Sequence, residues 1–219
     1  MIPHYVIDTT AAQTELCQLG HLCHTDKSPF NTMGHRHPYT GVYSMLFAPL
    51  RARPALRFAE IGVAMGASVA VWDQYFKRDD TVIYGFDRDE ALLTGLKQRV
   101  PSPRIQCGVM DVQVDGAIHE SLATASGGQP YDVIIDDSTH GLEDQLRIIK
   151  EAFPLVRAGG GLLIVEDIFR STPDSAFYDT VGDTCAEAPG SFAYFVDCEH
   201  ELKWSPGWDN DRLLVIVKG

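Results

Sequence analysis

Basic residues, paired cysteines and long apolar runs are all scarce in this sequence. Lysine and arginine total 18 against 30 acidic residues, and the net charge of −12 disfavours binding to the phosphates of a nucleic acid. The five cysteines are scattered without a CxxC pair, so neither a disulfide framework nor a zinc site is expected. No run approaches the roughly 18 apolar residues of a membrane span, and the first residues lack the order of a secretory signal. We therefore expect a cytoplasmic protein that binds neither nucleic acid nor membranes.

From about residue 56 onward, short apolar runs alternate with segments of helical periodicity. This alternation is typical of βαβ units on a parallel sheet that is covered on both faces. The expected strands are Leu56–Ile61, Thr81–Phe86, Arg104–Cys107, Tyr131–Ile135 and Leu162–Val165, and the expected helices lie near 68–76, 90–99, 116–124 and 142–156. The fold class that we predict is α/β, with a Rossmann-like, doubly wound, mostly parallel sheet.

Two further β-rich runs, Ser191–Asp197 and Arg212–Val217, predict an antiparallel pair of strands at the C-terminal end of the sheet. Before them, apolar residues between Leu142 and Val156 recur at steps of three and four, which predicts an amphipathic helix capped by the glycines at 159–161. We expect a single compact domain in which residues 1–50 form an N-terminal cap or lid and residues 51–219 form the α/β body.

The turn after the first of these strands has the features of a ligand-binding turn. Gly62 and Gly66 allow a ligand to approach the backbone at a helix N-terminus. Glu60 would repel a pyrophosphate but can accept a hydrogen bond from the ammonium group of S-adenosylmethionine, a group that NAD lacks. Asp87 ends the next strand, where an acid can bind both ribose hydroxyls, and Asp111 follows the third strand, where the adenine would lie. A purely structural turn and a helix-capping Asp111 are the alternatives.

A denser group of polar residues follows two later strands. Asp137 and His140 come after one strand and Glu166 and Asp167 after the next, so all four are expected at the sheet edge where open α/β sheets bind ligands. Clustered carboxylates need a compensating positive charge, which a divalent cation with oxygen ligands supplies. We expect magnesium to orient an acceptor hydroxyl while His140 takes its proton. Helix-capping aspartates and a surface histidine are the alternative reading.

At these residues the sequence resembles the metal-dependent sugar O-methyltransferases of antibiotic biosynthesis, such as the mycinamicin and macrocin enzymes, with cephalosporin hydroxylase-like proteins as relatives. The resemblance extends from about Thr25 to Asp167. Its segments are Thr25-Asp-Lys27 with His37-Pro-Tyr-Thr-Gly-Val-Tyr43, Glu60-Ile-Gly-Val with Gly66-Ala-Ser68 and Trp72, Asp136-Asp-Ser-Thr-His140, and Glu166-Asp167. One departure is Ser138-Thr139, which replaces the Gly-Ser of the family's DDGSH motif.

The resemblance implies a class I methyltransferase that uses S-adenosylmethionine. It also implies that Asp137, Glu166 and Asp167 bind magnesium and that His140 is the general base. The residues expected at the donor site are Glu60, Gly62, Gly66, Ser68, Asp87, Asp111 and Asp136, with Lys27 and Tyr39 in a lid over the donor. The implied partner is a small hydroxylated molecule such as the sugar of a glycoside, and a homo-oligomer stays open.

Other functions also stay open from the sequence alone. A catechol-type methyltransferase would combine the same metal with a flat aromatic acceptor, whereas a donor-binding regulator or a cyclase would transfer no methyl group. A nicotinamide oxidoreductase is disfavoured by Glu60 and the acidic cluster. Two segments have no assigned role. In His21–His37 no histidine pair has helical ligand spacing, and the two indoles of Trp204–Trp208 fit either an acceptor wall or packing over the sheet edge.

Overall fold

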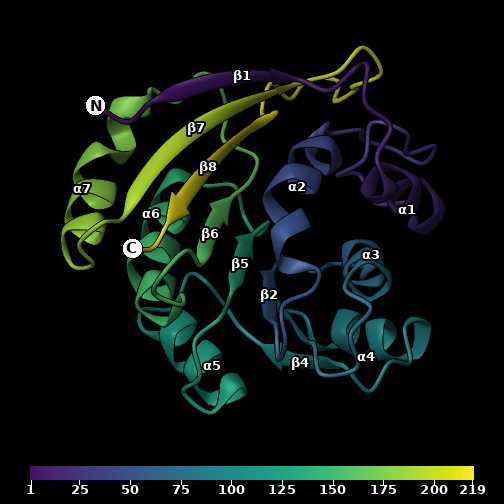
Figure 1. Cartoon of the computed structure of the whole chain (residues 1–219), viewed down its shortest axis with the longest axis horizontal. Helices are drawn as coiled ribbons and strands as arrows, with labels where there is room; N and C mark the ends of the chain where they lie inside the picture. Colours follow the sequence, from purple (N-terminus) through teal and green to yellow (C-terminus); the bar gives the residue numbers. More distant parts are fainter.

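The computed structural model describes residues 1–219 and places one curved sheet between two layers of helices (Figure 1). The strands are β1 (His4–Asp8), β2 (Arg57–Ile61), β3 (Val82–Asp87), β4 (Ile105–Val109), β5 (Val133–Asp136), β6 (Leu162–Val165), β7 (Phe192–Glu199) and β8 (Arg212–Val217). The α-helices are α1 (Glu15–Cys23), α2 (Tyr39–Phe47), α3 (Ala67–Tyr75), α4 (Glu90–Arg99), α5 (Ala117–Ser126), α6 (Leu142–Ala152) and α7 (Tyr178–Ala186). Short 3-10 helices are η1 (Ala48–Leu50), η2 (Phe153–Leu155) and η3 (Asp174–Phe177).

The eight strands lie in the order β1-β7-β8-β6-β5-β2-β3-β4. All neighbouring pairs are parallel except those of β8, which is antiparallel to both β6 and β7. The strand order reverses between β2 and β5, and this switch point is where doubly wound sheets bind ligands. The predicted fold class, including the C-terminal antiparallel pair, is therefore confirmed.

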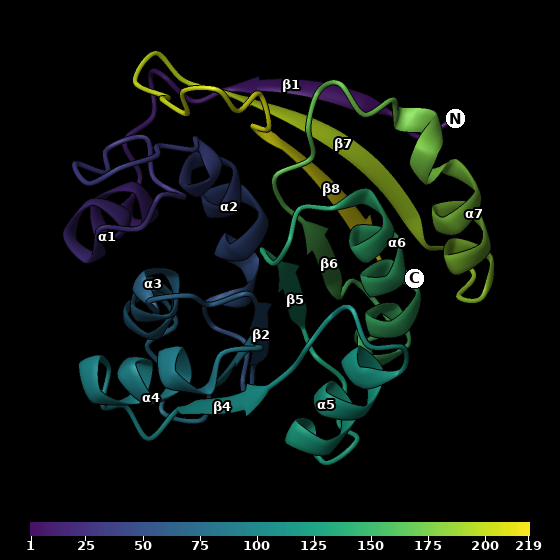
Figure 2. The same cartoon turned by 180° about the vertical axis from the view of Figure 1, so that it is seen from behind.

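The core divides into two apolar clusters, one on each face of the sheet. Along β5, Val133 and Ile135 belong to the first cluster and Ile134 to the second, as expected for a strand buried on both faces. Helices α1 to α4 contribute to the first cluster, and α5 to α7 contribute to the second (Figures 1 and 2). None of the helices combines the length and the apolar character that crossing a membrane requires.

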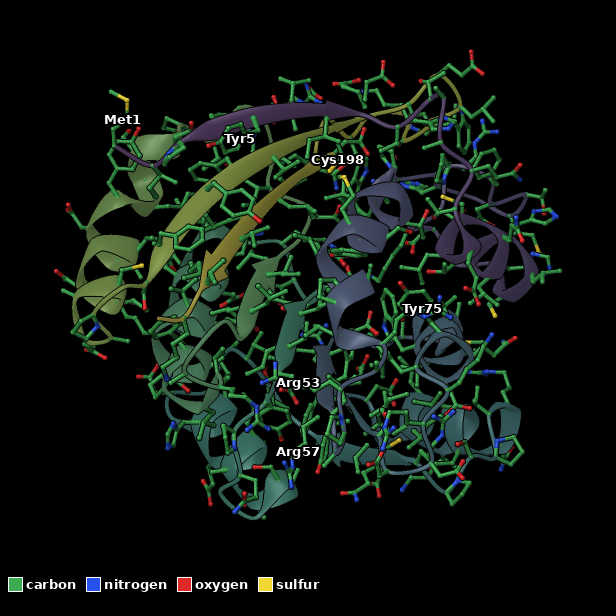
Figure 3. The ribbon with its side chains drawn as sticks, in the orientation of Figure 1. Met1, Tyr5, Arg53, Arg57, Tyr75 and Cys198 are labelled. Atoms are coloured by element: carbon green, nitrogen blue, oxygen red, sulfur yellow. The ribbon has the colours of Figure 1, made fainter.

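The N-terminal segment is part of this architecture. Strand β1 extends the sheet by pairing in parallel with β7, a contact that the sequence analysis did not predict. Helix α2 packs into the first cluster through Tyr39, Tyr43 and Phe47, and Cys198 at the far end of β7 lies beside it (Figure 3). The division at residue 51 stays a prediction, but residues 1–50 share a core with the rest of the chain.

One local prediction is wrong. The glycines at 159–161 do not cap α6, because that helix ends at Ala152 and continues only as η2. Pro154 has no backbone N–H with which to extend the α-helical ladder. The glycines instead form the turn into β6, where Gly159 and Gly160 have φ values of +79° and +104° and donate backbone hydrogen bonds to Gly219 and Lys218.

Candidate active site

Two glycines shape the turn between β2 and α3. Gly62 has a φ of +89°, and a Cβ atom there would lie 2.0 Å from the backbone oxygen of Asp137. Gly66 has a φ of +78°, and its Cβ would lie 2.3 Å from a methyl group of Leu96. Both positions therefore require glycine because of the backbone conformation and of neighbouring protein atoms. Gly62 in particular lets the β2–α3 turn touch the segment that follows β5.

A cleft of about 400 Å³ opens at the carboxyl ends of β2, β3 and β4. Its lining includes three residues that were predicted at the donor site, Gly62, Asp87 and Asp111. Asp87 is held in place because its carboxylate accepts hydrogen bonds from the backbone N–H groups of Ala64 (2.9 Å) and Asp89 (3.0 Å). The cleft is within the size range of small-molecule sites.

A second cleft, of about 290 Å³, meets the first at Gly62. It is lined by Thr25 and Asp26 of the N-terminal segment, by Ser68 in the first turn of α3 and by Asp137 after β5. Because both clefts are lined by Gly62, they are neighbours along the β2–α3 turn, one at Asp87 and Asp111 and the other at Asp137.

Glu60 is fully buried and lines neither cleft. Its Oε2 accepts a hydrogen bond from the indole Nε1 of Trp72 (2.7 Å), while Oε1 has no hydrogen-bond partner. The Lys27 Nζ lies 3.4 Å from Oε1 and supplies an opposite charge. A buried carboxylate oxygen without a hydrogen bond is uncommon and leaves Glu60 able to accept one more donor.

Lys27 is the internal cation of the site. Its side chain is 2% exposed, and Nζ lies 2.5 Å from both Asp137 Oδ2 and Glu166 Oε2. Burial opposes the charge, but Asp137, Glu166 and Glu60 outweigh it and hold the pKa of Lys27 well above its usual value. The ammonium group of Lys27 therefore forms ion pairs with Glu60 of β2 and with Asp137 and Glu166, the acidic residues after β5 and β6.

Asp137, His140 and Asp167 form the group best suited to hold a metal ion. One potential ligand atom from each lies within 4.8 Å of the others. His140 and Asp167 have φ values of 58° and 56°, a left-handed conformation that is rare for residues other than glycine and that occurs preferentially at functional sites. The structure thus brings together two of the three predicted carboxylate ligands and the predicted base.

Glu166 does not join that group in this structure. Lys27 contacts its Oε2, and the hydroxyl of Tyr43 donates a hydrogen bond to its Oε1. Burial raises the pKa of Glu166 to about 8, with Asp167 and Glu60 adding to the shift and Lys27 opposing it. Its role as a metal ligand stays a prediction, and that role requires Lys27 to release one oxygen.

Asp136 supports the turn after β5. Its side chain is buried, and its Oδ1 accepts hydrogen bonds from the hydroxyl (2.6 Å) and the backbone N–H (3.2 Å) of Ser138. Burial raises the pKa of Asp136 to about 7 despite these hydrogen bonds. Direct donor binding by Asp136 stays a prediction, because the contacts here are to the loop that carries His140.

Tyr39 is fully buried and contacts the acidic cluster at Asp167. Its buried hydroxyl donates a hydrogen bond of 2.6 Å to Asp167 Oδ1 and lies 3.0 Å from the backbone oxygen of Asn210. Its ring stacks on His37, with centroids 5.1 Å apart and planes 9° apart. Lys27 and Tyr39 are thus fixed among the carboxylates, and the lid that they were predicted to form over the donor stays untested.

His140 is suited to accept a proton. Its side chain is 20% exposed, and Nε2 lies 3.6 Å from Asp167 Oδ2. Burial lowers the pKa of His140, with Asp167 opposing that shift, so the imidazole is neutral near pH 7. Because both an imidazole proton acceptor and a metal ligand must be neutral, either role is chemically open to His140.

Several residues at the site were not predicted from the sequence. Tyr43 and His37 appeared only as parts of a motif, without a role, and Asp211 and Asn210 were not noted at all. Both of these polar residues immediately precede the apolar strand β8, a position that could have marked them. Asn210 is fully buried, and neither polar atom of its side-chain amide has a hydrogen-bond partner.

The pH dependence of stability tests the His37 contact. Burial opposes the charge on His37, but the hydrogen bond of Nδ1 to Asp211 (2.8 Å) and the charge of Asp167 raise its pKa above 6.5. A raised pKa stabilises the fold fully below pH 6.5, and this contribution is lost as the pH rises through the folded value. We expect His37→Gln to be less stable than the native chain at pH 6 and to approach it at higher pH. Urea unfolding at several pH values measures this, and a difference independent of pH would contradict it.

Known proteins and a protein-family model match parts of this chain that include residues of the site. A family model described as a methyltransferase domain matches residues 59–168. The 8-demethyl-8-alpha-L-rhamnosyl tetracenomycin-C 2'-O-methyltransferase of Streptomyces olivaceus is 33% identical over 175 residues, which cover 77% of this chain and 43% of that protein. The demethylmacrocin O-methyltransferase of Streptomyces fradiae is 32% identical over 62% of this chain and 33% of its own length.

Among solved structures, the chain resembles the methyltransferase MycE from the mycinamycin biosynthetic pathway in complex with Mg, SAH and mycinamycin VI. The TM-score is 0.66 at 21% identity, and the match covers 95% of this chain and 55% of that one. At this identity the likeness concerns the fold. The chain spans less than half the length of both curated relatives described above.

Proposed function

Because the chain belongs to the methyltransferase domain family, we propose that it is an O-methyltransferase that transfers a methyl group from S-adenosylmethionine to a hydroxyl of a small glycoside, with Mg²⁺ bound at the acceptor side. The observation that carries this proposal is the meeting of two sites. The donor-sized clefts along the β2–α3 turn end at Asp137, which also belongs to the group with His140 and Asp167.

The donor fits the residues of the two clefts. Asp87, fixed by two backbone N–H groups, would accept hydrogen bonds from the ribose hydroxyls, and Asp111 lies in the same cleft for the adenine. Glu60 has a free lone pair on its buried Oε1, which matches the ammonium group of the donor. The predicted donor set also includes Gly62 and Ser68, which line the clefts, and Gly66 and Asp136, which do not.

The metal fits the donor atoms after β5 and β6. Asp137 and Asp167 would hold the ion with carboxylate oxygens, as Mg²⁺ prefers, and Glu166 would join them only after Lys27 moves. When bound, the ion supplies a positive charge that lowers the pKa of an acceptor hydroxyl. Without it, Lys27 compensates the charge of Asp137 and Glu166, and His37, when protonated, lies 3.8 Å from Asp167.

In the transfer step, residues of this chain accept a proton and stabilise the resulting charge. The acceptor oxygen bonds to the methyl carbon of the donor as the carbon–sulfur bond breaks, and the hydroxyl proton passes to the neutral imidazole of His140. Asp167, which Tyr39 fixes by a hydrogen bond, faces Nε2 of His140 and would stabilise the imidazolium. Alignment of donor and acceptor contributes the remainder of the rate.

The acceptor class is proposed from the relatives, whose names describe O-methylation of a rhamnosyl tetracenomycin and of demethylmacrocin. A catechol acceptor and a donor-binding protein without transfer remain as alternatives that experiment can separate. The net charge of −12 favours a small molecule over a nucleic acid as partner, and a homo-oligomer remains a prediction.

Calorimetry with S-adenosylhomocysteine and with Mg²⁺ tests the proposal on the native chain, Asp87→Asn and Asp137→Asn. We expect the native chain to bind both. Asp87→Asn should weaken binding of S-adenosylhomocysteine on the order of 10-fold, because charged hydrogen bonds contribute about 1.5–3 kcal/mol. It should leave Mg²⁺ binding unchanged. Asp137→Asn should instead weaken Mg²⁺ binding and leave binding of S-adenosylhomocysteine unchanged.

Two outcomes would contradict the proposal. A native chain that binds no S-adenosylhomocysteine is not a methyl-donor enzyme. A chain that binds it but forms none from S-adenosylmethionine with rhamnosides or catechols, at saturating Mg²⁺, is a donor-binding protein without transfer.

A further inference from the structure

Two half-exposed indoles stand in the loop between β7 and β8. Trp204 is 47% exposed and Trp208 46% exposed, which is unusual for such large apolar side chains. The loop is anchored to the N-terminal segment, because the backbone of Trp204 exchanges two hydrogen bonds with Arg36 (2.9 and 3.0 Å). The loop that carries the two indoles is therefore fixed, while the indoles themselves are about half exposed.

Trp208 stands next to the proposed catalytic base. Its ring centroid lies 6.2 Å from that of His140, 5.7 Å from Phe169 and 5.9 Å from His35. Phe169 follows Asp167 by two residues, so the aromatic group borders the acidic cluster directly. Trp204 contacts His35 and Arg36 and has no ring contact with His140.

The ring contacts of Trp208 leave part of its indole uncovered. Trp208 meets His140 and His35 edge to face, at 80° and 83°, and is tilted by 37° to Phe169. None of the three ring contacts of Trp208 is a parallel stack, and its side chain is 46% exposed, so indole surface is open to a ligand. A planar aromatic acceptor gains most from a slot, whereas a pyranose ring has one apolar C–H face and needs one aromatic surface.

We propose that Trp208, flanked by Phe169 and His35, is the platform on which the sugar ring of the acceptor stacks. This inference rests on the proposed function and specifies its substrate class as a pyranoside. The C–H face of the sugar packs on the indole, and the hydroxyl at the ring edge points to His140 and Asp167. Trp204 lies outside the contact and serves as a matched comparison, since it is as exposed and belongs to the same loop.

The three tryptophans allow a direct test by NMR of the indole N–H groups. The native chain, saturated with S-adenosylhomocysteine and Mg²⁺, is titrated with methyl α-L-rhamnopyranoside and separately with catechol. We expect the rhamnoside to shift the Trp208 signal most, the Trp204 signal less, and the signal of buried Trp72 not at all. Signals are assigned from Trp204→Phe and Trp208→Phe, and an unchanged Trp72 signal shows that each variant is folded.

Affinity completes the test. Trp208→Ala should weaken rhamnoside binding on the order of 10-fold, because aromatic contacts at the centre of a site dominate its binding. Trp204→Ala should change it by less than about 3-fold. Equal losses in both variants, or a Trp208 signal that responds to catechol alone, would overturn the platform. If S-adenosylhomocysteine binds and the rhamnoside moves no indole signal, the platform fails while the donor site stands. If S-adenosylhomocysteine itself does not bind, the proposed function fails and this inference with it.

Discussion

Replacing His140 by glutamine is expected to lower kcat for methyl transfer by about 10²–10⁴-fold while leaving donor affinity unchanged. General-base catalysis contributes about this much, and glutamine keeps the size of the side chain but cannot take a proton at neutral pH. Because burial lowers the pKa of His140 below its usual value, the native rate should fall as the pH is lowered through that pKa and the imidazole becomes protonated. Steady-state kinetics across this range, with calorimetry of S-adenosylhomocysteine, measure both effects.

The matched control is His119→Gln, an exposed histidine on α5, which should leave kcat within about 2-fold of the native value. Calorimetry with Mg²⁺ separates the two roles that the geometry leaves open to His140. A variant that loses Mg²⁺ affinity together with activity would show that His140 is a ligand of the ion and contradict its assignment as the base.

Replacing Lys27 by methionine is expected to lower the free energy of unfolding by about 3–5 kcal/mol, because the change leaves buried carboxylates without their counter-charge. The Lys27 side chain is 2% exposed. Methionine replaces its buried apolar stem by one of similar length but removes the contacts of Nζ with Asp137 and Glu166. Added Mg²⁺ should recover part of this loss, since the ion supplies positive charge at the same carboxylates. Urea unfolding with Mg²⁺ and with a chelator measures both quantities.

Lys77→Met is the control, because Lys77 also pairs with a glutamate (3.0 Å from Glu15) but is 68% exposed. Exposed pairs contribute at most about 1 kcal/mol, so little change is expected there. If Lys27→Met and Lys77→Met cost the same, the buried cation does not hold the acidic cluster together. If Mg²⁺ stabilises native and Lys27→Met equally, the ion and Lys27 act on separate groups.

Regular periodicity made much of the α/β body predictable. The bounds expected for β6, β8 and α4 coincide with those observed, because each has an uninterrupted pattern and clear flanking residues. The sequence also indicated that Asp137 and Asp167 would meet, since both follow neighbouring parallel strands and such strands end at one edge of the sheet.

Contacts between distant segments could not be predicted in the same way. Lys27 precedes Asp137 by 110 positions, and nothing in the spacing showed that its side chain would lie among carboxylates. Nor does the order of two adjacent acids reveal that Glu166 turns to Lys27 and Tyr43 while Asp167, with its positive φ, faces His140. Strand β1 was missed because it is a short edge strand whose Tyr5 and Val6 are largely exposed.

The position of β8 constrains how the molecule can assemble. This strand comes last among the strands in sequence, yet it lies inside the sheet, between β6 and β7. During synthesis, the sheet therefore cannot be completed from one side to the other, and β1 cannot pair until β7 has been made, although β1 precedes β7 in the sequence. The hydrogen bonds of His37 and Tyr39 to Asp211 and Asn210 likewise form only after the segment before β8 has been made. Synthesis through the start of β8 thus precedes formation of the site, and long-range pairing of this kind makes folding slow.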